Sequence, residues 1–126
     1  MSGVLFFMKN NQKIGSLGEN IAKKFLEDKG YKIIDMNVKM SYKELDLIAK
    51  HKGKIIFVEV KTRTSSFLGS ADGAMSSKKI KNLKKAMGMY VSYKQLDPEN
   101  VRLDLIAIDM NFGEKNTNIK HYEDIF

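Results

Sequence analysis

Carboxylates and a lysine recur at two-residue spacing in two neighbouring apolar segments. Glu44 and Asp46 lie in "ELDLIAK", and Glu59 and Lys61 lie in "KIIFVEVKT". If both segments are strands, alternation directs each pair to one face of a sheet, with Glu59 and Lys61 about 7 Å apart along the strand. Opposite charges at this spacing form either a simple ion pair or part of a metal site.

The turn between the two segments decides which side chains meet. If Lys52 and Gly53 are the central residues of a two-residue turn, pairing outward places Asp46 opposite Glu59 and Glu44 opposite Lys61. A three-residue loop with a bulge would shift this register by one residue. With the two-residue turn, three carboxylates and a lysine converge, and this is our hypothesis for the site.

Clustered carboxylates repel one another unless a proton or a cation lies between them. Oxygen ligands suit Mg²⁺ or Mn²⁺, so we expect Asp46 and Glu59, with a backbone carbonyl such as that of Val60, to hold such an ion. Lys61 would then position the nucleophile, lower its effective pKa, or neutralise charge on a phosphate. The residue pattern does not separate these three roles.

Glu19 is a candidate accessory residue on a predicted helix. It falls at the border of the apolar stripe beside Ala22 and Leu26, where Gly15 and Gly18 would let the helix approach a sheet closely. Its carboxylate would then point inward. The alternative is a solvated glutamate in the first turn of a helix, favoured there by the helix dipole.

The charge balance favours a polyanionic partner. The chain has 22 Lys and Arg against 15 Asp and Glu, a net charge of +7, which is typical of proteins that contact phosphates. We expect DNA contacts from one face of a lysine-rich helix and from the end of the third predicted strand, although a solvated strand end explains the latter equally well. The candidate residues are Lys78, Lys79, Lys81 and Arg63.

The length and composition indicate one domain. The chain has 126 residues and no cysteine, which excludes disulfides and thiolate metal sites and is compatible with a reducing cytoplasm. We expect residues 1–12 to be a short tether and residues 13–126 to form the domain. No segment has the apolar length needed to span a bilayer, so we expect no membrane partner.

The apolar periodicity predicts an α/β fold. A helix is expected after Ser16 and should end at Gly30, followed by strands in "YKIIDMNV", "ELDLIAK" and "KIIFVEVKT". A second helix is expected from Ser77 as N-cap, then a strand in "VRLDLIAID" and a short final element in "NIKHYEDIF". This order, α-β-β-β-α-β with one more element, indicates a mixed central sheet flanked by helices.

Several of these segments together resemble a known family. The runs "GSLGENIAKKFLEDKGYKIIDMN", "ELDLIAK", "IIFVEVKTR" and "VRLDLIAID", with the lysine-rich helix, resemble the YraN-like family over roughly residues 13–126. That family is related to PD-(D/E)XK nucleases and archaeal Holliday-junction resolvases. The resemblance implies a restriction-endonuclease-like fold.

The resemblance also implies roles for individual residues. Asp46 matches the motif aspartate, Glu59 and Lys61 match its E-x-K, and Glu19 matches the helix glutamate. Lys43 stands where the family commonly has glycine, and it would alter the strand entry or add a phosphate contact. Lys39 stands where an arginine is frequent.

Three hypotheses follow for the function. The first is a Mg²⁺- or Mn²⁺-dependent nuclease acting on DNA, including structured or branched DNA in repair or recombination; a junction substrate would imply a homodimer with two sites. The second is a non-catalytic nucleic-acid-binding module with a vestigial nuclease site. The third is a small scaffold protein with a charged sheet face.

Overall fold

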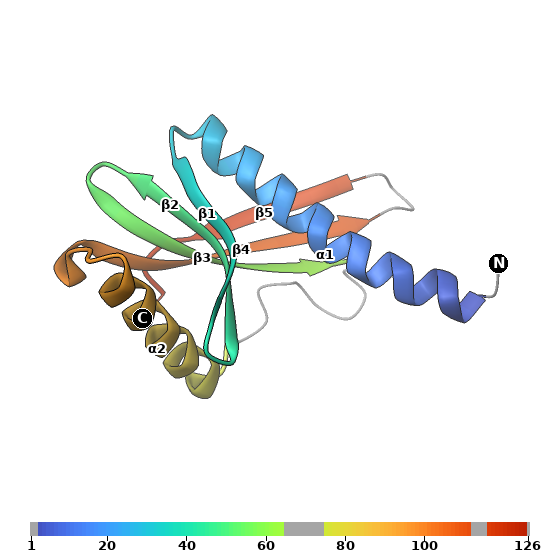
Figure 1. Ribbon diagram of the computed structural model, residues 1–126. Coiled ribbons are helices and arrows are strands. Elements are labelled where there is room, and N and C mark those ends of the chain that lie inside the picture. Colours follow the sequence, from blue (N-terminus) through green and yellow to red (C-terminus); the bar gives the residue numbers. More distant parts are fainter. Residues whose placement is uncertain (1–2, 65–74, 112–115, 126) are drawn as a thin grey trace.

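A five-stranded mixed sheet lies between two helices (Figure 1). The structure is a computed structural model, and it describes residues 3–64, 75–111 and 116–125. The elements are α1 (Gly3–Asp28), β1 (Lys32–Met40), β2 (Lys43–His51), β3 (Lys54–Arg63), α2 (Ser77–Tyr93), the 3₁₀ helix η2 (Pro98–Asn100), β4 (Val101–Asn111) and β5 (Asn116–Tyr122). The strand order is β1-β2-β3-β4-β5, with β3 and β4 parallel and the other neighbours antiparallel.

The predicted fold class and element order are confirmed, but the start of the first helix was wrong. α1 begins at Gly3 instead of after Ser16, so residues 3–12, expected to be a tether, continue the helix. A glycine inside a helix costs about 1 kcal/mol relative to alanine and does not by itself end it. The helix runs on past the edge of the sheet (Figure 1). The division into a tether and a domain of residues 13–126 stays a prediction.

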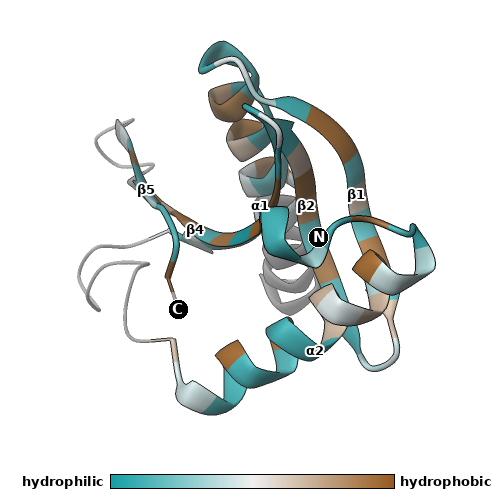
Figure 2. Ribbon diagram, turned by 90° about the vertical axis from the view of Figure 1, so that its left-hand side faces the viewer, coloured by the Kyte–Doolittle hydropathy of each residue, from teal (hydrophilic) through white to brown (hydrophobic). Residues whose placement is uncertain are grey.

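The second helix has its N-cap one residue before the predicted position. The side chain of Ser76, not Ser77, accepts a hydrogen bond from the backbone N–H of Lys79, 3.1 Å away. This satisfies one of the free N–H groups of the first turn. Hydrophilic stretches run along much of α2 (Figure 2). Among the described helices, none is long and apolar enough to cross a membrane.

Alternation along β3 divides the core between the two faces of the sheet. Ile56 and Val58 pack with residues of α1, while Ile55 and Phe57 pack with residues of α2. Burying a side chain of this size stabilises the fold by roughly 1.5–3 kcal/mol. From α1, the buried residues are Ala22 and Leu26; from α2, they are Leu83, Ala86, Met87, Tyr90 and Val91.

The β1–β2 ribbon changes face near its middle. Met36 and Leu47, which are paired, belong to the α1 side, but the next pair, Val38 and Leu45, packs with the α2 side. Asn37 lies between these pairs with a φ of 52°, a left-handed conformation that asparagine tolerates better than most residues. Leu45 and Leu47 therefore pack on different sides of the sheet, although they are two residues apart in β2.

The turn between β2 and β3 follows the two-residue alternative. His51 pairs with Lys54, and Lys52 and Gly53 have φ values of 50° and 78°, as a type I′ turn requires. The ladder then continues to Leu47 opposite Val58 and ends there. The expected backbone pairs of Asp46 with Glu59 and of Glu44 with Lys61 lie beyond this point, where the two strands separate.

Gly18 lies where α1 approaches β3 closely. A Cβ atom built there would lie 1.9 Å from the Thr62 side-chain oxygen and 3.0 Å from its Cβ, whereas a Cβ at Gly15 would meet nothing within 4 Å. Only glycine lets the helix lie this close to the strand. Because the next residue is Glu19, the same contact sets the height of that carboxylate over the sheet.

We expect Gly18→Ala to destabilise the protein by about 1–3 kcal/mol, because the added methyl group forces α1 away from Thr62. Gly15→Ala on the same helix is the matched control and should be neutral or stabilising by up to about 1 kcal/mol. Chemical denaturation measures both. Adding Thr62→Ala to Gly18→Ala should recover part of the loss; equal stability of the two glycine variants would contradict the close contact.

Candidate metal centre

Three carboxylates meet where β2 leaves β3. Glu19 from α1 and Glu44 and Asp46 from β2 each have one oxygen within 4.8 Å of the others, and we call them the carboxylate trio. The helix brings Glu19 to the sheet, as the helical wheel predicted. Exposed acidic groups gather often without a ligand, so the trio by itself does not define a site. Its neighbours supply the further evidence.

Asn37 joins two members of the trio. With its amide nitrogen facing the carboxylates, Asn37 donates hydrogen bonds to Glu19 Oε1 at 2.9 Å and to Glu44 Oε1 at 3.0 Å. The left-handed backbone at the bend of β1 places the side chain there. Desolvation by burial and the negative charges of Glu44 and Glu59 raise the pKa of Glu19 above its ordinary value, and the Asn37 hydrogen bond opposes that rise.

Asp46 is fixed by the backbone of the neighbouring strand. The N–H of Val60 donates to Asp46 Oδ2 at 2.8 Å, beyond the last rung of the β2–β3 ladder. Burial, followed by the negative charge of Glu59, raises the pKa of Asp46 from 3.8 to about 7, against the lowering effect of the Val60 hydrogen bond. The negative charge of Glu59 therefore acts on Asp46, the other predicted ligand.

Glu59 stands beside the trio and is almost completely buried, with 6% of its surface exposed. Its Oε1 lies 3.5 Å from Lys79 Nζ and 3.7 Å from Lys43 Nζ. Its Oε2 is buried and has no hydrogen-bond partner. A buried carboxylate oxygen without a partner is costly, and a cation placed beside it would lower that cost.

Lys61 lies on the same face as Glu59, two residues along β3. Burial, and then the positive charge of Lys79, lower the pKa of Lys61, while Glu59 opposes that shift. Arg63, Lys78 and Lys81 are exposed around this region. Lys43 and Lys79, predicted to contact DNA, instead pair with Glu59 in this structure. Their role toward DNA stays a prediction.

A second polar cluster lies away from the trio and is held by hydrogen bonds among its own members. Arg102 donates two hydrogen bonds to Asp104, and His121 Nε2 lies 2.7 Å from Asp104 Oδ2. Asp104, His121 and Glu123 have the spacing of a metal site, but Asp104 already has the guanidinium and the imidazole as partners. The members of this polar network are Tyr31, Arg102, Asp104, His121 and Glu123.

Burial opposes the ionised form of Asp104, but hydrogen bonds from His121, Arg102 and the Asp124 backbone outweigh it and hold the pKa of Asp104 below its ordinary value. A carboxylate kept ionised by these partners is a structural anchor for β5 and the chain that follows it. Arg102 and Asp104 are two residues apart on one face of β4 and form an ion pair there, whereas the sequence spacing gave no indication that His121 would join them.

The structure brings Glu19, Asp46, Glu59 and Lys61 into one region, and their catalytic and metal-binding roles stay predictions. The same holds for the Val60 carbonyl, since the contact seen at this residue is made by its N–H. Sequence reasoning missed Asn37. An asparagine inside a predicted strand was the available signal, because asparagine is depleted in strands and enriched at left-handed positions.

Known proteins similar to this chain come from several bacteria. A family model described as "Uncharacterised protein family UPF0102" matches residues 18–108. A UPF0102 protein of Clostridium beijerinckii is 37% identical over 118 residues, covering 94% of this chain and 96% of the relative. One from Syntrophomonas wolfei is 40% identical (86% and 94% covered), and one from Flavobacterium johnsoniae is 38% identical (94% and 98% covered). The relation to YraN-like proteins and PD-(D/E)XK nucleases stays a prediction.

The raised pKa of Asp46 makes the stability of the metal-free protein depend on pH. In the folded protein the Asp46 carboxyl group keeps its proton up to about pH 7, whereas in the unfolded chain it loses the proton near pH 3.8. The resulting stabilisation of the folded protein is complete below pH 3.8 and is lost as the pH rises through about 7. Each pKa unit between the folded and unfolded values corresponds to about 1.4 kcal/mol, so the full loss in the free energy of unfolding is about 4 kcal/mol at most.

We expect Asp46→Asn to remove this slope, so that the variant gains stability over the wild type at pH 8 but not at pH 4. Urea denaturation in EDTA across that range measures the difference. Parallel pH profiles for the two proteins would show that the Asp46 carboxyl group is not buried against Glu59.

Proposed function

We propose that this chain, which belongs to the uncharacterised protein family UPF0102, is a divalent-metal-dependent nuclease that hydrolyses phosphodiester bonds in DNA. The observation that supports this proposal most is that the Oε2 atom of Glu59 is buried and has no hydrogen-bond partner. Beside it, burial and the charge of Glu59 raise the pKa of Asp46 to about 7. A divalent cation relieves both costs at once.

The donor set fits Mg²⁺ or Mn²⁺. Asp46 and Glu59 are the proposed ligands, with the carbonyl of Val60 as a third, and oxygen donors are what these ions prefer. When bound, such an ion lowers the pKa of a coordinated water and stabilises charge on a phosphate. Glu19 is the proposed accessory residue that orients water, and Asn37 holds its carboxylate in position.

Lys61 is proposed as the residue that exchanges a proton with water at the scissile phosphate. Its pKa is lowered by burial and by Lys79, which makes the ammonium group a better proton donor near neutral pH than an ordinary lysine. The negative charge of the neighbouring Glu59 opposes this lowering of the Lys61 pKa. An exposed lysine would supply only a fixed positive charge.

The proposed DNA surface consists of cations around this site. Phosphate contacts from a basic surface release counterions and give binding that weakens steeply with salt. A branched or structured DNA substrate, a cytoplasmic location and a homodimer that presents two sites are parts of the same proposal. The proposed contact residues are Lys43, Arg63, Lys78, Lys79 and Lys81.

A non-catalytic nucleic-acid-binding module is the second candidate. The observation in its favour is that Lys43 and Lys79 both pair with Glu59 Oε1, which partly balances the charge of the site without a metal. In such a module the carboxylates would be structural. Binding of DNA that is insensitive to divalent ions and to Lys61→Ala would favour this candidate over the nuclease.

We expect the purified protein to cleave DNA in Mg²⁺ or Mn²⁺ and to lose at least about 100-fold of that rate on Asp46→Asn or Lys61→Ala, because each removes a group needed in the transition state. A panel of labelled duplex, single-stranded and four-way-junction DNA, resolved on gels, measures the rate. Glu27→Gln, an exposed glutamate of α1, should cleave like the wild type, in contrast to Glu19→Gln. If none of these DNA substrates is cleaved, the nuclease proposal is overturned.

The lysines that pair with Glu59 should compete with a divalent cation. We expect Lys79→Ala to strengthen Mn²⁺ binding to the DNA-free protein by several-fold, because one ammonium group no longer has to leave Glu59. Lys81→Ala on the same helix removes the same charge but not this ion pair, and should leave Mn²⁺ affinity close to that of the wild type. Calorimetric titration measures both; weaker Mn²⁺ binding in Lys79→Ala would contradict the competition.

A further inference from the structure

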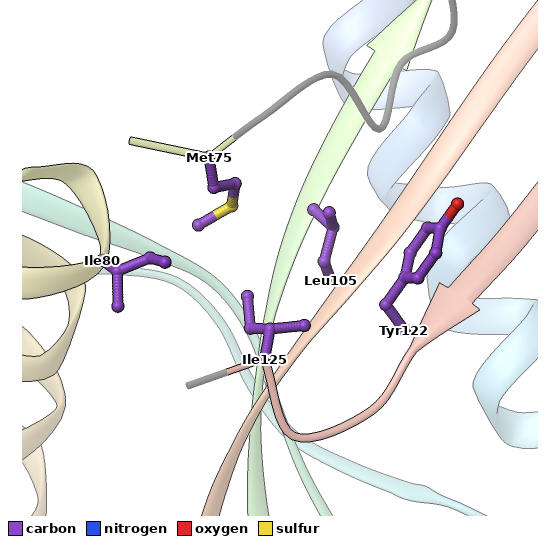
Figure 3. Close-up of a pocket in the computed structure, with 5 residues that line it drawn as sticks. All are labelled: Met75, Ile80, Leu105, Tyr122 and Ile125. Atoms are coloured by element: carbon purple, nitrogen blue, oxygen red, sulfur yellow. The ribbon is translucent and has the colours of Figure 1, made fainter. Parts of the chain in front are cut away.

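An apolar cavity lies between the start of α2 and the strands β4 and β5. Its volume is about 270 Å³, and Figure 3 shows the side chains that enclose it, with the Tyr122 ring on one side and the α2 residue on the other. The only polar side-chain atom among them is the Tyr122 hydroxyl oxygen. We call it the apolar pocket, and its lining residues are Met75, Ile80, Leu105, Tyr122 and Ile125.

The apolar pocket begins one strand away from the candidate metal centre. Leu105 is the partner of Glu59 in the β3–β4 ladder and of Tyr122 in the β4–β5 ladder. Paired residues of neighbouring strands share a face, at a spacing of about 4.8 Å between strands. Glu59, Leu105 and Tyr122 therefore form one row across the sheet, which runs from the metal centre into the pocket.

The next row of the same face is cationic at both ends. Lys61 is the partner of Ala107, which is the partner of Lys120. A ligand seated at this place therefore meets positive charge along one edge and an apolar hollow with an aromatic wall beside it. That combination matches a nucleotide, whose phosphate is anionic and whose base is flat and largely apolar on its faces.

We propose that the apolar pocket receives an unpaired nucleobase of a DNA strand whose phosphate lies at the metal centre. The inference rests on the proposed function and names its substrate class. A base inside a duplex is stacked and paired and does not reach a pocket in the protein surface without leaving the helix. The preferred substrate therefore carries an unpaired nucleotide next to the scissile phosphate, as a single strand, gap or flap does.

The pocket lining also sets the base preference. Among the described lining residues, the side chains are aliphatic, thioether and aromatic groups, which suit contact with the face of any base. The Tyr122 hydroxyl is the one polar side-chain group among these described residues. Stacking of this kind tolerates all four bases. We therefore expect recognition of an unpaired base without strong sequence specificity.

The test compares binding of two fluorescent single strands of equal length in Ca²⁺: one of thymidines and one of abasic residues with the same phosphates. The wild type should prefer the strand with bases by about tenfold, the scale of stacking one base. Ile80→Phe, which fills the pocket, should abolish most of that preference while leaving affinity for the abasic strand unchanged. Tyr122→Leu removes the ring but keeps an apolar side chain, and should have the same effect.

Leu96→Phe is the matched control. It makes the same kind of change in a separate apolar groove at the other end of α2, and should leave the preference at the wild-type value. If both Ile80→Phe and Tyr122→Leu keep the wild-type preference for the strand with bases, the proposal that the pocket receives a base is overturned. Sedimentation showing a wild-type dimer that Ile80→Phe dissociates would overturn it too, because the pocket would then be a contact between copies.

The outcome is separable from that of the nuclease proposal. If the protein cleaves DNA in Mg²⁺ but no pocket variant alters its preference for the strand with bases, the nuclease proposal is supported and the pocket proposal is overturned. A preference that both variants abolish, in a protein that cleaves nothing, would support the pocket and assign it to a binding module. Binding of neither strand would overturn the pocket proposal, whereas the nuclease proposal is decided separately by cleavage of the duplex, single-stranded and junction DNA.

Discussion

The hydrogen bond from the Val60 N–H to the Asp46 carboxylate is the interaction on which the candidate site depends. It forms just beyond the last rung between β2 and β3, so a side chain takes over a backbone donor that the ladder no longer satisfies. A buried N–H without a partner is costly, so the strands can separate here because a carboxylate replaces the missing carbonyl. The same bond holds Asp46 beside Glu59 despite their repulsion.

Separation of the strands also makes room for a third element. Gly18 brings α1 down onto Thr62, and Glu19 then reaches the opening between β2 and β3. Asn37, at the bend of β1, bridges this carboxylate to Glu44. Four carboxyl side chains thus converge, and the lysines at Glu59 offset part of their negative charge.

The far end of the sheet is held by chemistry of a different kind. Asp104 is fully buried, but the network of Arg102, His121 and the Asp124 backbone satisfies it and keeps it ionised. A network with its polar groups paired rigidifies the chain around it. By fixing β5 and the residues after it, this network positions Tyr122 and Ile125, which form two walls of the apolar pocket. In contrast, the Oε2 atom of Glu59 is buried without a hydrogen-bond partner.

Periodicity in the sequence determined the number, type and order of the elements, because alternation and helical spacing report which side of each element is buried. The Lys52–Gly53 turn likewise determined the β2–β3 register as far as Leu47 and Val58, since a two-residue turn fixes the pairing that follows. Local pattern could not show where that pairing stops. The bend at Asn37, the change of face at Leu45 and the gathering of Glu44 with Glu19 depend on contacts between segments far apart in the chain, and only the tertiary structure decides those.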